Sequence, residues 1–284
     1  MRIQEHIIRE ATSDDAFMGR THALSATALI LSCFAFIHGA ASWLPKDRAS
    51  ALAFLAFITL IAAGGALLPD LDNTKSTALT QLGVAGEIIS LIMRATAPLI
   101  KGAIHTKYDN NLDNPHRSFY HTTIAAILCG GLTALLCSPL ISWNLGFYTI
   151  TGRENAIFLA FVSIDLALSS IVGAIWANKK PAIVAVSLLC SFVIAFGLTL
   201  VLPKNVPYTI VGLMLGIGWF IHCLGDCFTT AGTPLFWPIP IKGKMWYNIR
   251  FLPIKAGGVI ENFFFMPLFI IITIIAAITL ILTV

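Results

Sequence analysis

Two residues with metal-ligand side chains lie four positions apart near the end of a long apolar run. They are His222 and Asp226, within the stretch 219–238. If the run is helical, positions i and i+4 share one face, so the imidazole and the carboxylate can converge on one ion. Ionisable residues inside an apolar span are functional candidates by default, although the pair could also be polar groups hydrogen-bonded among packed helices. The pair is the first candidate for a metal site.

Five more residues of the same kind lie near the ends of other apolar runs. A histidine opens the first run, two aspartates follow the second and two histidines open the third: His22, Asp70, Asp72, His116 and His121. Together with the first pair they make four imidazoles and three carboxylates, more than one four-coordinate ion with an open position needs. The set predicts two divalent ions, or one ion with a further carboxylate as general base. We expect zinc, although mixed nitrogen and oxygen ligands also admit manganese or ferrous iron.

The composition is that of a membrane protein. Of 284 residues, 57% are hydrophobic and only 11% charged, and the apolar runs have lengths suited to crossing a bilayer. We therefore expect an all-α, polytopic helical membrane protein with a single membrane-embedded domain over 1–284, in which 1–21 is a polar lead-in. A net charge of +4 without a basic block gives no indication of a nucleic-acid partner.

Seven runs are predicted to span the membrane, at about 22–43, 50–68, 115–143, 156–176, 182–202, 208–228 and 260–283. The apolar stretch 79–104 is different, because Glu87, Arg94 and Lys101 recur every seven residues and so share one helical stripe. Each charge would cost roughly 2.5–3.5 kcal/mol at the centre of a lipid-exposed span. We predict that this stretch lies at the interface or is re-entrant.

The number of crossings brings the candidate ligands together. If 79–104 does not cross, all seven lie at one membrane face. Fourteen of the eighteen Lys and Arg residues then fall on that same face. By the positive-inside rule this face is cytoplasmic in a bacterial inner membrane. The N-terminus, the metal site and the loop 229–258 are therefore expected in the cytoplasm and the C-terminus in the periplasm. Turn signals in 239–255 indicate a short hairpin over the site.

Other polar residues have a functional and a structural interpretation. Arg117 could clamp a phosphate with its planar fork, or anchor the chain at the interface. Asp72 or Asp226 could act as the general base of a hydrolysis, with Arg117 as the third catalytic residue. His38 and Asp165 lie inside predicted spans and are expected to be satisfied polar groups of the core.

Three motifs also carry a family resemblance. LLPDLD at 67–72, HRSFYH at 116–121 and HCLGDCFTTAGTPLFWP at 222–238 resemble the YdjM family of bacterial inner-membrane metal-dependent hydrolases, often described as LexA-regulated. The likeness covers about 22–261 and implies a hydrolase. That family is distantly similar to the zinc-dependent phospholipase C and P1 nuclease group, whose H-x-x-x-D/E turn matches His222 to Asp226. This chain lacks the free N-terminal metal-binding residue of those enzymes, so a third metal is not implied.

These observations lead to two competing functions. The first is an inner-membrane metal-dependent hydrolase that acts on a phospholipid or other lipid phosphoester at the cytoplasmic face, where headgroups lie. The second is a transporter or metal-ion-handling membrane protein, which would place its ligands near the bilayer midplane on broken helices in matching halves. Ligands at helix ends and the absence of an internal repeat favour the hydrolase, and the sequence names no protein partner.

Overall fold

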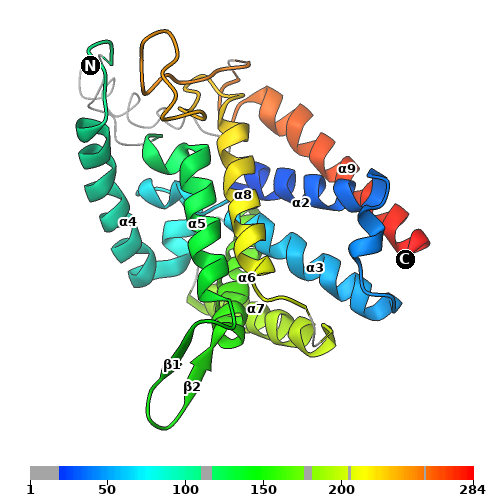
Figure 1. Cartoon of the computed structure of the whole chain (residues 1–284). Helices are drawn as coiled ribbons and strands as arrows, with labels where there is room; N and C mark the ends of the chain where they lie inside the picture. The colour runs from blue at the N-terminus through cyan, green and yellow to red at the C-terminus, as the bar shows by residue number, and fades with distance from the viewer. Residues whose placement is uncertain (1–18, 110–116, 176–180, 204–205, 253) are drawn as a thin grey trace.

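The computed structural model describes residues 19–109, 117–175, 181–203, 206–252 and 254–284. The protein is all-α, as the sequence predicts (Figure 1). Its long helices are α2 (Gly19–Phe36), α3 (Arg48–Gly65), α4 (Thr77–Ala103), α5 (Thr123–Leu136), α6 (Gly152–Ile175), α7 (Pro181–Val201), α8 (Ile210–Asp226) and α9 (Met266–Thr283). Short 3-10 segments η1 (Ala40–Trp43), η2 (Pro69–Asp72) and η3 (Phe119–His121) and a π-helical turn, η4 (Glu261–Phe265), complete the helical part.

Two local predictions need correction. The third apolar run was expected to reach 143, but α5 ends at Leu136, shortly before Pro139, and the chain then forms an antiparallel hairpin of β1 (Ser142–Asn144) and β2 (Thr149–Thr151). The hairpin expected in 239–255 is not a regular one in the described part of that loop, where only isolated bridges such as Ile241–Lys244 occur. Backbone contacts with other segments take the place of a regular ladder there.

Helix α8 lies at the centre of the packing, and small residues let its neighbours approach. A Cβ on Gly212 would lie 2.1 Å from the backbone nitrogen of Ala134 in α5. A Cβ on Gly218 would lie 2.0 Å from the backbone oxygen of Ala62 in α3. Small residues at such crossings are the usual means by which helices associate in a bilayer, because lipid offers no hydrophobic drive between them. The glycines of α8 therefore fix its position between α3 and α5.

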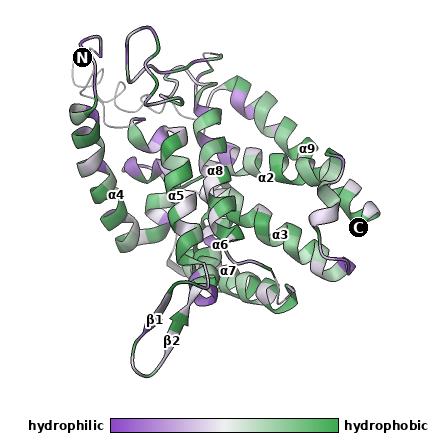
Figure 2. Cartoon of the chain, in the orientation of Figure 1, coloured by the Kyte–Doolittle hydropathy of each residue, from purple (hydrophilic) through white to green (hydrophobic). Residues whose placement is uncertain are grey.

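The helices consist largely of hydrophobic residues (Figure 2), and many of their large apolar side chains are exposed. Four described segments are long and apolar enough to cross a membrane: Arg48–Asp72, Ala78–Ala103, Val184–Val201 and Glu261–Thr283. Helices α5 and α8 are apolar but shorter. An apolar exterior of this kind is stable only in contact with lipid, so the fold is that of an integral membrane protein.

Helix α4 consists of two pieces that meet at Gly83, whose φ of 53° and ψ of −130° are not helical. The prediction that three charges share one stripe is only partly right, since Glu87 and Arg94 are exposed whereas Lys101 is buried against the protein. A seven-residue repeat drifts by about 20° per heptad on a straight α-helix, and the drift carries the third charge into the buried face. The opposite face presents Val84, Ile88, Leu91, Ile92 and Leu99 outward.

Of the two polar residues expected in the core, Asp165 is there and His38 is not. The Asp165 carboxylate accepts hydrogen bonds from Gln81 Nε2 at 2.8 Å, Ser187 Oγ at 2.9 Å and Ser191 Oγ at 3.2 Å. Helix α2 ends at Phe36, so His38 falls in the following turn and is exposed.

Candidate metal centre

The last turn of α8 supplies the two residues at the middle of the site. His222 and Asp226 are both fully buried, and His222 Nε2 lies 3.5 Å from Asp226 Oδ2. The other ring nitrogen of His222, Nδ1, lies 2.8 Å from the backbone carbonyl oxygen of Ala66 at the end of α3. Because a carbonyl only accepts, Nδ1 carries the proton and Nε2 presents its lone pair to the site. No motif predicts this orienting carbonyl.

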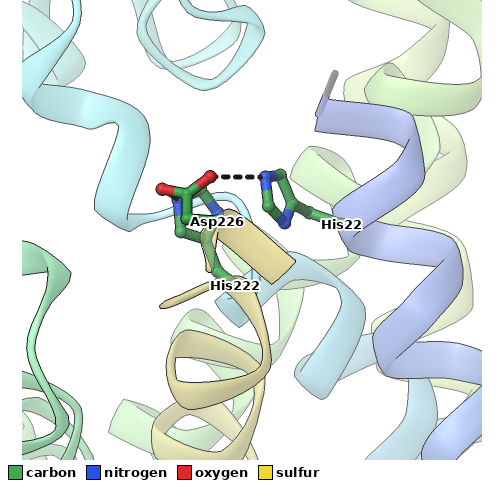
Figure 3. Close-up of side chains that lie close together, drawn as sticks. All are labelled: His22, His222 and Asp226. Carbon is green, nitrogen blue, oxygen red and sulfur yellow. Dashed lines mark ion pairs between the residues drawn. The ribbon is translucent and has the colours of Figure 1, made fainter. Parts of the chain in front are cut away.

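The first turns of α2 bring His22 against this pair. Its ring stacks on the ring of His222 with centroids 3.8 Å apart, and His22 Nε2 lies 3.5 Å from Asp226 Oδ1 (Figure 3). One ligand atom from each of His22, His222 and Asp226 lies within 4.8 Å of the other two. The three residues can therefore hold one ion between them.

The segment η2 carries the two other aspartates of the site, Asp70 and Asp72. Pro69 opens this 3-10 turn shortly after the end of α3, and both Asp70 and Asp72 are buried. Asp70 Oδ1 lies 3.5 Å from His222 Nε2. A second group with metal-binding geometry is formed by Asp70, His121 and His222. Because the two groups share His222, they form one continuous cluster.

His121, at the end of η3, bridges two carboxylates. Its Nδ1 lies 3.1 Å from Asp226 Oδ2 and its Nε2 lies 3.4 Å from Asp72 Oδ2. The carboxylates thus favour positive charge between them. We call His22, Asp70, Asp72, His121, His222 and Asp226 the His/Asp cluster.

The distances in the His/Asp cluster fit a bound divalent ion. Contacts of 3.4–3.5 Å, such as that between His222 Nε2 and Asp70 Oδ1, are longer than the usual N–H···O bond. They are close to the edge of a zinc tetrahedron, about 3.3 Å for bonds of about 2.0 Å. Asp70 Oδ1 and His222 Nε2 are buried and make no hydrogen bond within the described part of the chain. The nitrogen and oxygen donors present therefore suit a metal ion.

Arg117 supports the cluster from the side of Asp226. Its guanidinium donates to Thr229 Oγ1 at 2.8 Å and to the carbonyl of Gly232 at 3.3 Å, and lies 3.4 Å from Asp226 Oδ1. The side chain is nearly buried. These contacts fix the orientation of Asp226, and they do not test the phosphate-clamp role predicted for Arg117. The predicted ligand His116 lies outside the described residues.

The loop after α8 lies over this end of the bundle and is fixed to the end of α4. Asp109 accepts hydrogen bonds from the backbone of Met245 and Trp246, and Trp246 Nε1 donates to the carbonyl of Ile104 at 2.6 Å. Burial raises the pKa of Asp109, but the N–H donors of Thr106, Trp246 and Met245 outweigh it and lower the pKa. We call this set of contacts the Asp109 clamp.

The same loop reaches the cluster through Thr233, whose hydroxyl donates to the backbone carbonyl of His121 at 2.5 Å. Neither Thr233 nor Asp109 was identified from the sequence. Thr233 lies in the TTAGTP motif beside a glycine with positive φ, which is a turn signal and not a metal-site signal. Asp109 lies in a polar connection that has no motif.

Fold and site together define a class: a helical integral membrane protein with a buried His/Asp cluster, at one end of its central helix, that could hold a metal ion. Within that class, the chain belongs to the YdjM inner membrane protein family, which matches residues 17–177 and 187–284. This confirms the family resemblance of the three motifs. No curated protein and no solved structure matches the chain.

Proposed function

We propose that the protein is a metal-dependent hydrolase of a phospholipid or another lipid phosphoester. The observation that carries the proposal is the His/Asp cluster itself: three buried histidines and three buried aspartates at one end of an apolar bundle, with ligand atoms spaced as around a divalent ion. Buried charge of this density is too costly to be retained without a binding partner or a catalytic task.

Two ions are the arrangement that the donor atoms favour. His222 cannot bridge two ions, because its Nδ1 is hydrogen-bonded to the Ala66 carbonyl and only Nε2 remains as a ligand atom. Asp226 instead directs Oδ1 toward His22 and Oδ2 toward His121 and His222, so its carboxylate can bridge two positions. We expect zinc, and manganese or ferrous iron are chemically compatible with the same donors.

A divalent ion held by these residues supplies Lewis acidity toward a phosphoryl oxygen and a water that ionises near neutral pH. The chain itself supplies positioning and proton transfer. Asp72, at the edge of the cluster against His121, is the residue we assign as proton acceptor. Arg117 holds Asp226 in place and adds a fixed positive charge beside the position of the phosphate.

The position of the site favours a lipid substrate. The cluster lies where α3 and α8 end and α2 begins, next to the loop 229–258. A headgroup reaches such a depth while its chains stay in the bilayer. The Lys and Arg distribution of the sequence assigns this face to the cytoplasm of a bacterial inner membrane, with the C-terminus in the periplasm.

This assignment requires seven spans and a re-entrant α4. Two observations support the re-entrant course. Helix α4 bends at Gly83, and just before this bend Gln81 donates a hydrogen bond to Asp165 in the middle of α6. The far end of α4, at Ile104, then bonds to Trp246 in the loop that follows α8. Single cysteines at positions 75 and 107 should be labelled by a membrane-impermeant reagent from the same side; labelling from opposite sides would refute this topology.

The function is tested by metal analysis and turnover of the purified protein. Wild-type protein should contain a divalent metal and release product from phospholipid vesicles, and chelation should abolish the release. His222→Ala should lose metal and activity while staying inserted and folded. His38→Ala, which removes an exposed histidine away from the cluster, is the matched control and should keep both. Metal-loaded wild-type protein that cleaves no phosphoester would refute the proposal.

A metal-ion-handling or transport function is the second candidate, and one observation favours it. Asp165 is a buried carboxylate at mid-helix whose hydrogen-bond donors among the described residues, Gln81, Ser187 and Ser191, are all uncharged, a feature typical of ion pathways. The test is flux of Zn²⁺ or Mn²⁺ into proteoliposomes. Flux that is lost in the Asp165→Asn variant, but that persists when hydrolysis is inhibited, would support this function over the first.

A further inference from the structure

A groove with a volume of about 360 Å³ runs between α5 and α8, which lie side by side in Figure 1. This size is within the range of ligand-binding cavities, about 300–1,000 Å³. The groove is lined almost entirely by carbon atoms. The one hydroxyl in the lining, that of Thr123, is already donated to the carbonyl of Leu235 at 2.8 Å. A ligand in the groove would therefore make hydrocarbon contacts and no hydrogen bonds to its lining.

Glycines shape the groove in two different ways. Gly130 and Gly212 form its floor, where the helices touch: a Cβ on Gly130 would lie 2.9 Å from the backbone oxygen of Gly212. Gly131 lines the groove as well, but a Cβ there would meet no atom within 4 Å. The space above Gly131 is thus empty of protein, and a side chain could fill it without disturbing the helix contact.

One end of the groove reaches the level of the His/Asp cluster. Thr123 follows His121 by two residues, and Phe220 precedes His222 by two residues, about 3 Å along the helix axis. The short segment 233–235 borders both features, since Thr233 bonds to the backbone of His121 and the Leu235 carbonyl accepts from the backbone N–H of Thr123. The other end, at Gly212, lies about 12 Å farther along α8.

The side of the groove faces outward. Ile127 and Leu213, which line it, are 62% and 54% exposed on helices whose outer surfaces are apolar. In a bilayer, a hydrocarbon chain can therefore enter sideways without crossing a polar barrier. The occupant we infer is a single hydrocarbon chain, because the groove is lined by carbon and opens sideways onto the apolar exterior.

We propose that this groove binds an acyl chain of the lipid whose phosphoester lies at the His/Asp cluster. The identification of that lipid as substrate rests on the proposed hydrolase function. The groove holds one extended chain along α5 and α8, and the glycerol end of the lipid leaves it beside the segment 233–235. The substrate class is accordingly a long-chain glycerophospholipid, in preference to a water-soluble phosphoester of the same chemistry.

The test fills the groove at Gly131. Wild type, Gly131→Ala and Gly131→Leu are reconstituted in phosphatidylethanolamine and phosphatidylglycerol vesicles that contain a phospholipid with a photoreactive diazirine in its acyl chain. Gly197→Leu is the matched control, because Gly197 is also a helical glycine whose Cβ would meet nothing within 4 Å, but it lies on α7 away from the groove. Crosslinks are mapped by mass spectrometry, and folding is checked by thermal unfolding.

In the wild type we expect crosslinks concentrated on α5 and α8. Gly131→Leu should reduce the crosslink yield on α5 and α8 at least about tenfold. Excluding two methylenes of the acyl chain from the groove costs about 1.6 kcal/mol of binding free energy, which is slightly more than a tenfold loss of affinity. Gly131→Ala should be intermediate and Gly197→Leu unchanged. In turnover, Gly131→Leu should lower kcat/KM for a long-chain phospholipid by a similar factor and leave that for a short-chain soluble phosphoester unchanged.

The two proposals fail in different ways. If no phosphoester is cleaved but the α5 and α8 crosslinks form and are lost in Gly131→Leu, the groove is a lipid site and the hydrolase function is wrong. If phosphoesters are cleaved but crosslinks spread evenly over the lipid-facing helices, or persist in Gly131→Leu, the groove proposal is overturned. Equal loss of long- and short-chain turnover in Gly131→Leu would also overturn it.

Discussion

Replacing Arg117 with alanine separates the contribution of this side chain to the fold from its effect on the metal. The Arg117 guanidinium lies 3.4 Å from the fully buried carboxylate of Asp226. Removing one partner of a buried ion pair costs about 3–5 kcal/mol, because the remaining charge is left without compensation. We take about 3 kcal/mol, since His121 also faces Asp226 and can carry a proton.

In the metal-loaded protein the same substitution should cost less. The ion then supplies Asp226 with positive charge, and the remaining loss is that of the hydrogen bonds to Thr229 and Gly232, together about 1 kcal/mol. Arg117 has a positive φ of 57°. The strain of alanine in that conformation is common to both states and cancels in the difference. The difference of about 2 kcal/mol means that Arg117→Ala should bind the ion about 30-fold more tightly than wild type.

The assay compares thermal unfolding of the detergent-purified protein with and without Zn²⁺, and measures affinity by competition with a chelator. For a chain of this size the midpoint should fall by about 6–12 °C without metal and by about 2–4 °C with it. Arg94→Ala removes an exposed guanidinium from α4 and is the matched control, with little change expected in either state. Weaker metal binding by Arg117→Ala, or an equal loss of stability in both states, would refute this account of the site.

Three further substitutions test the surroundings of the site. Asp109→Asn should loosen the Asp109 clamp and speed tryptic cleavage in 242–255 several-fold. Because the pKa of Asp109 is lowered in the folded protein, its carboxylate stabilises the fold above the unfolded-state pKa of about 3.9, and this stability is lost as the pH falls through the lower folded-state pKa. Unchanged cleavage would show that the clamp does not hold the loop. Gln81→Leu removes a donor from buried Asp165 and should cost about 1–3 kcal/mol of stability without loss of metal, as thermal unfolding and metal analysis will report. Gly212→Ala places a Cβ against the α5 backbone and should prevent recovery of folded protein by size-exclusion chromatography, whereas Gly197→Ala has open space and should be at least as stable as wild type. Normal folding of Gly212→Ala would contradict the close α5–α8 contact.

Much of the fold and of the site could be predicted locally. Apolar runs and their interruptions gave the helical membrane class, and the four-residue spacing gave the shared face of His222 and Asp226, which are together in the structure. The third run was overextended, because the apolar residues between Leu136 and Trp143 belong to the turn after α5 and to the start of β1, and hydropathy alone does not show where the helix ends. The burial of Lys101 on α4 was missed for a geometric reason, since a heptad pattern and a straight helix drift apart.

The sequence by itself determined the residue types and the shared helical face of His222 and Asp226, because these follow from composition and helical periodicity. Only the tertiary structure decided which atoms meet: His22 stacked on His222, His121 between Asp72 and Asp226, and Arg117 directed at Asp226. It also decided that glycines leave a groove between α5 and α8. Such contacts join residues about 100 or more positions apart in most cases, as from Arg117 to Asp226. Their geometry depends on side-chain directions and helix crossings, which no local pattern encodes.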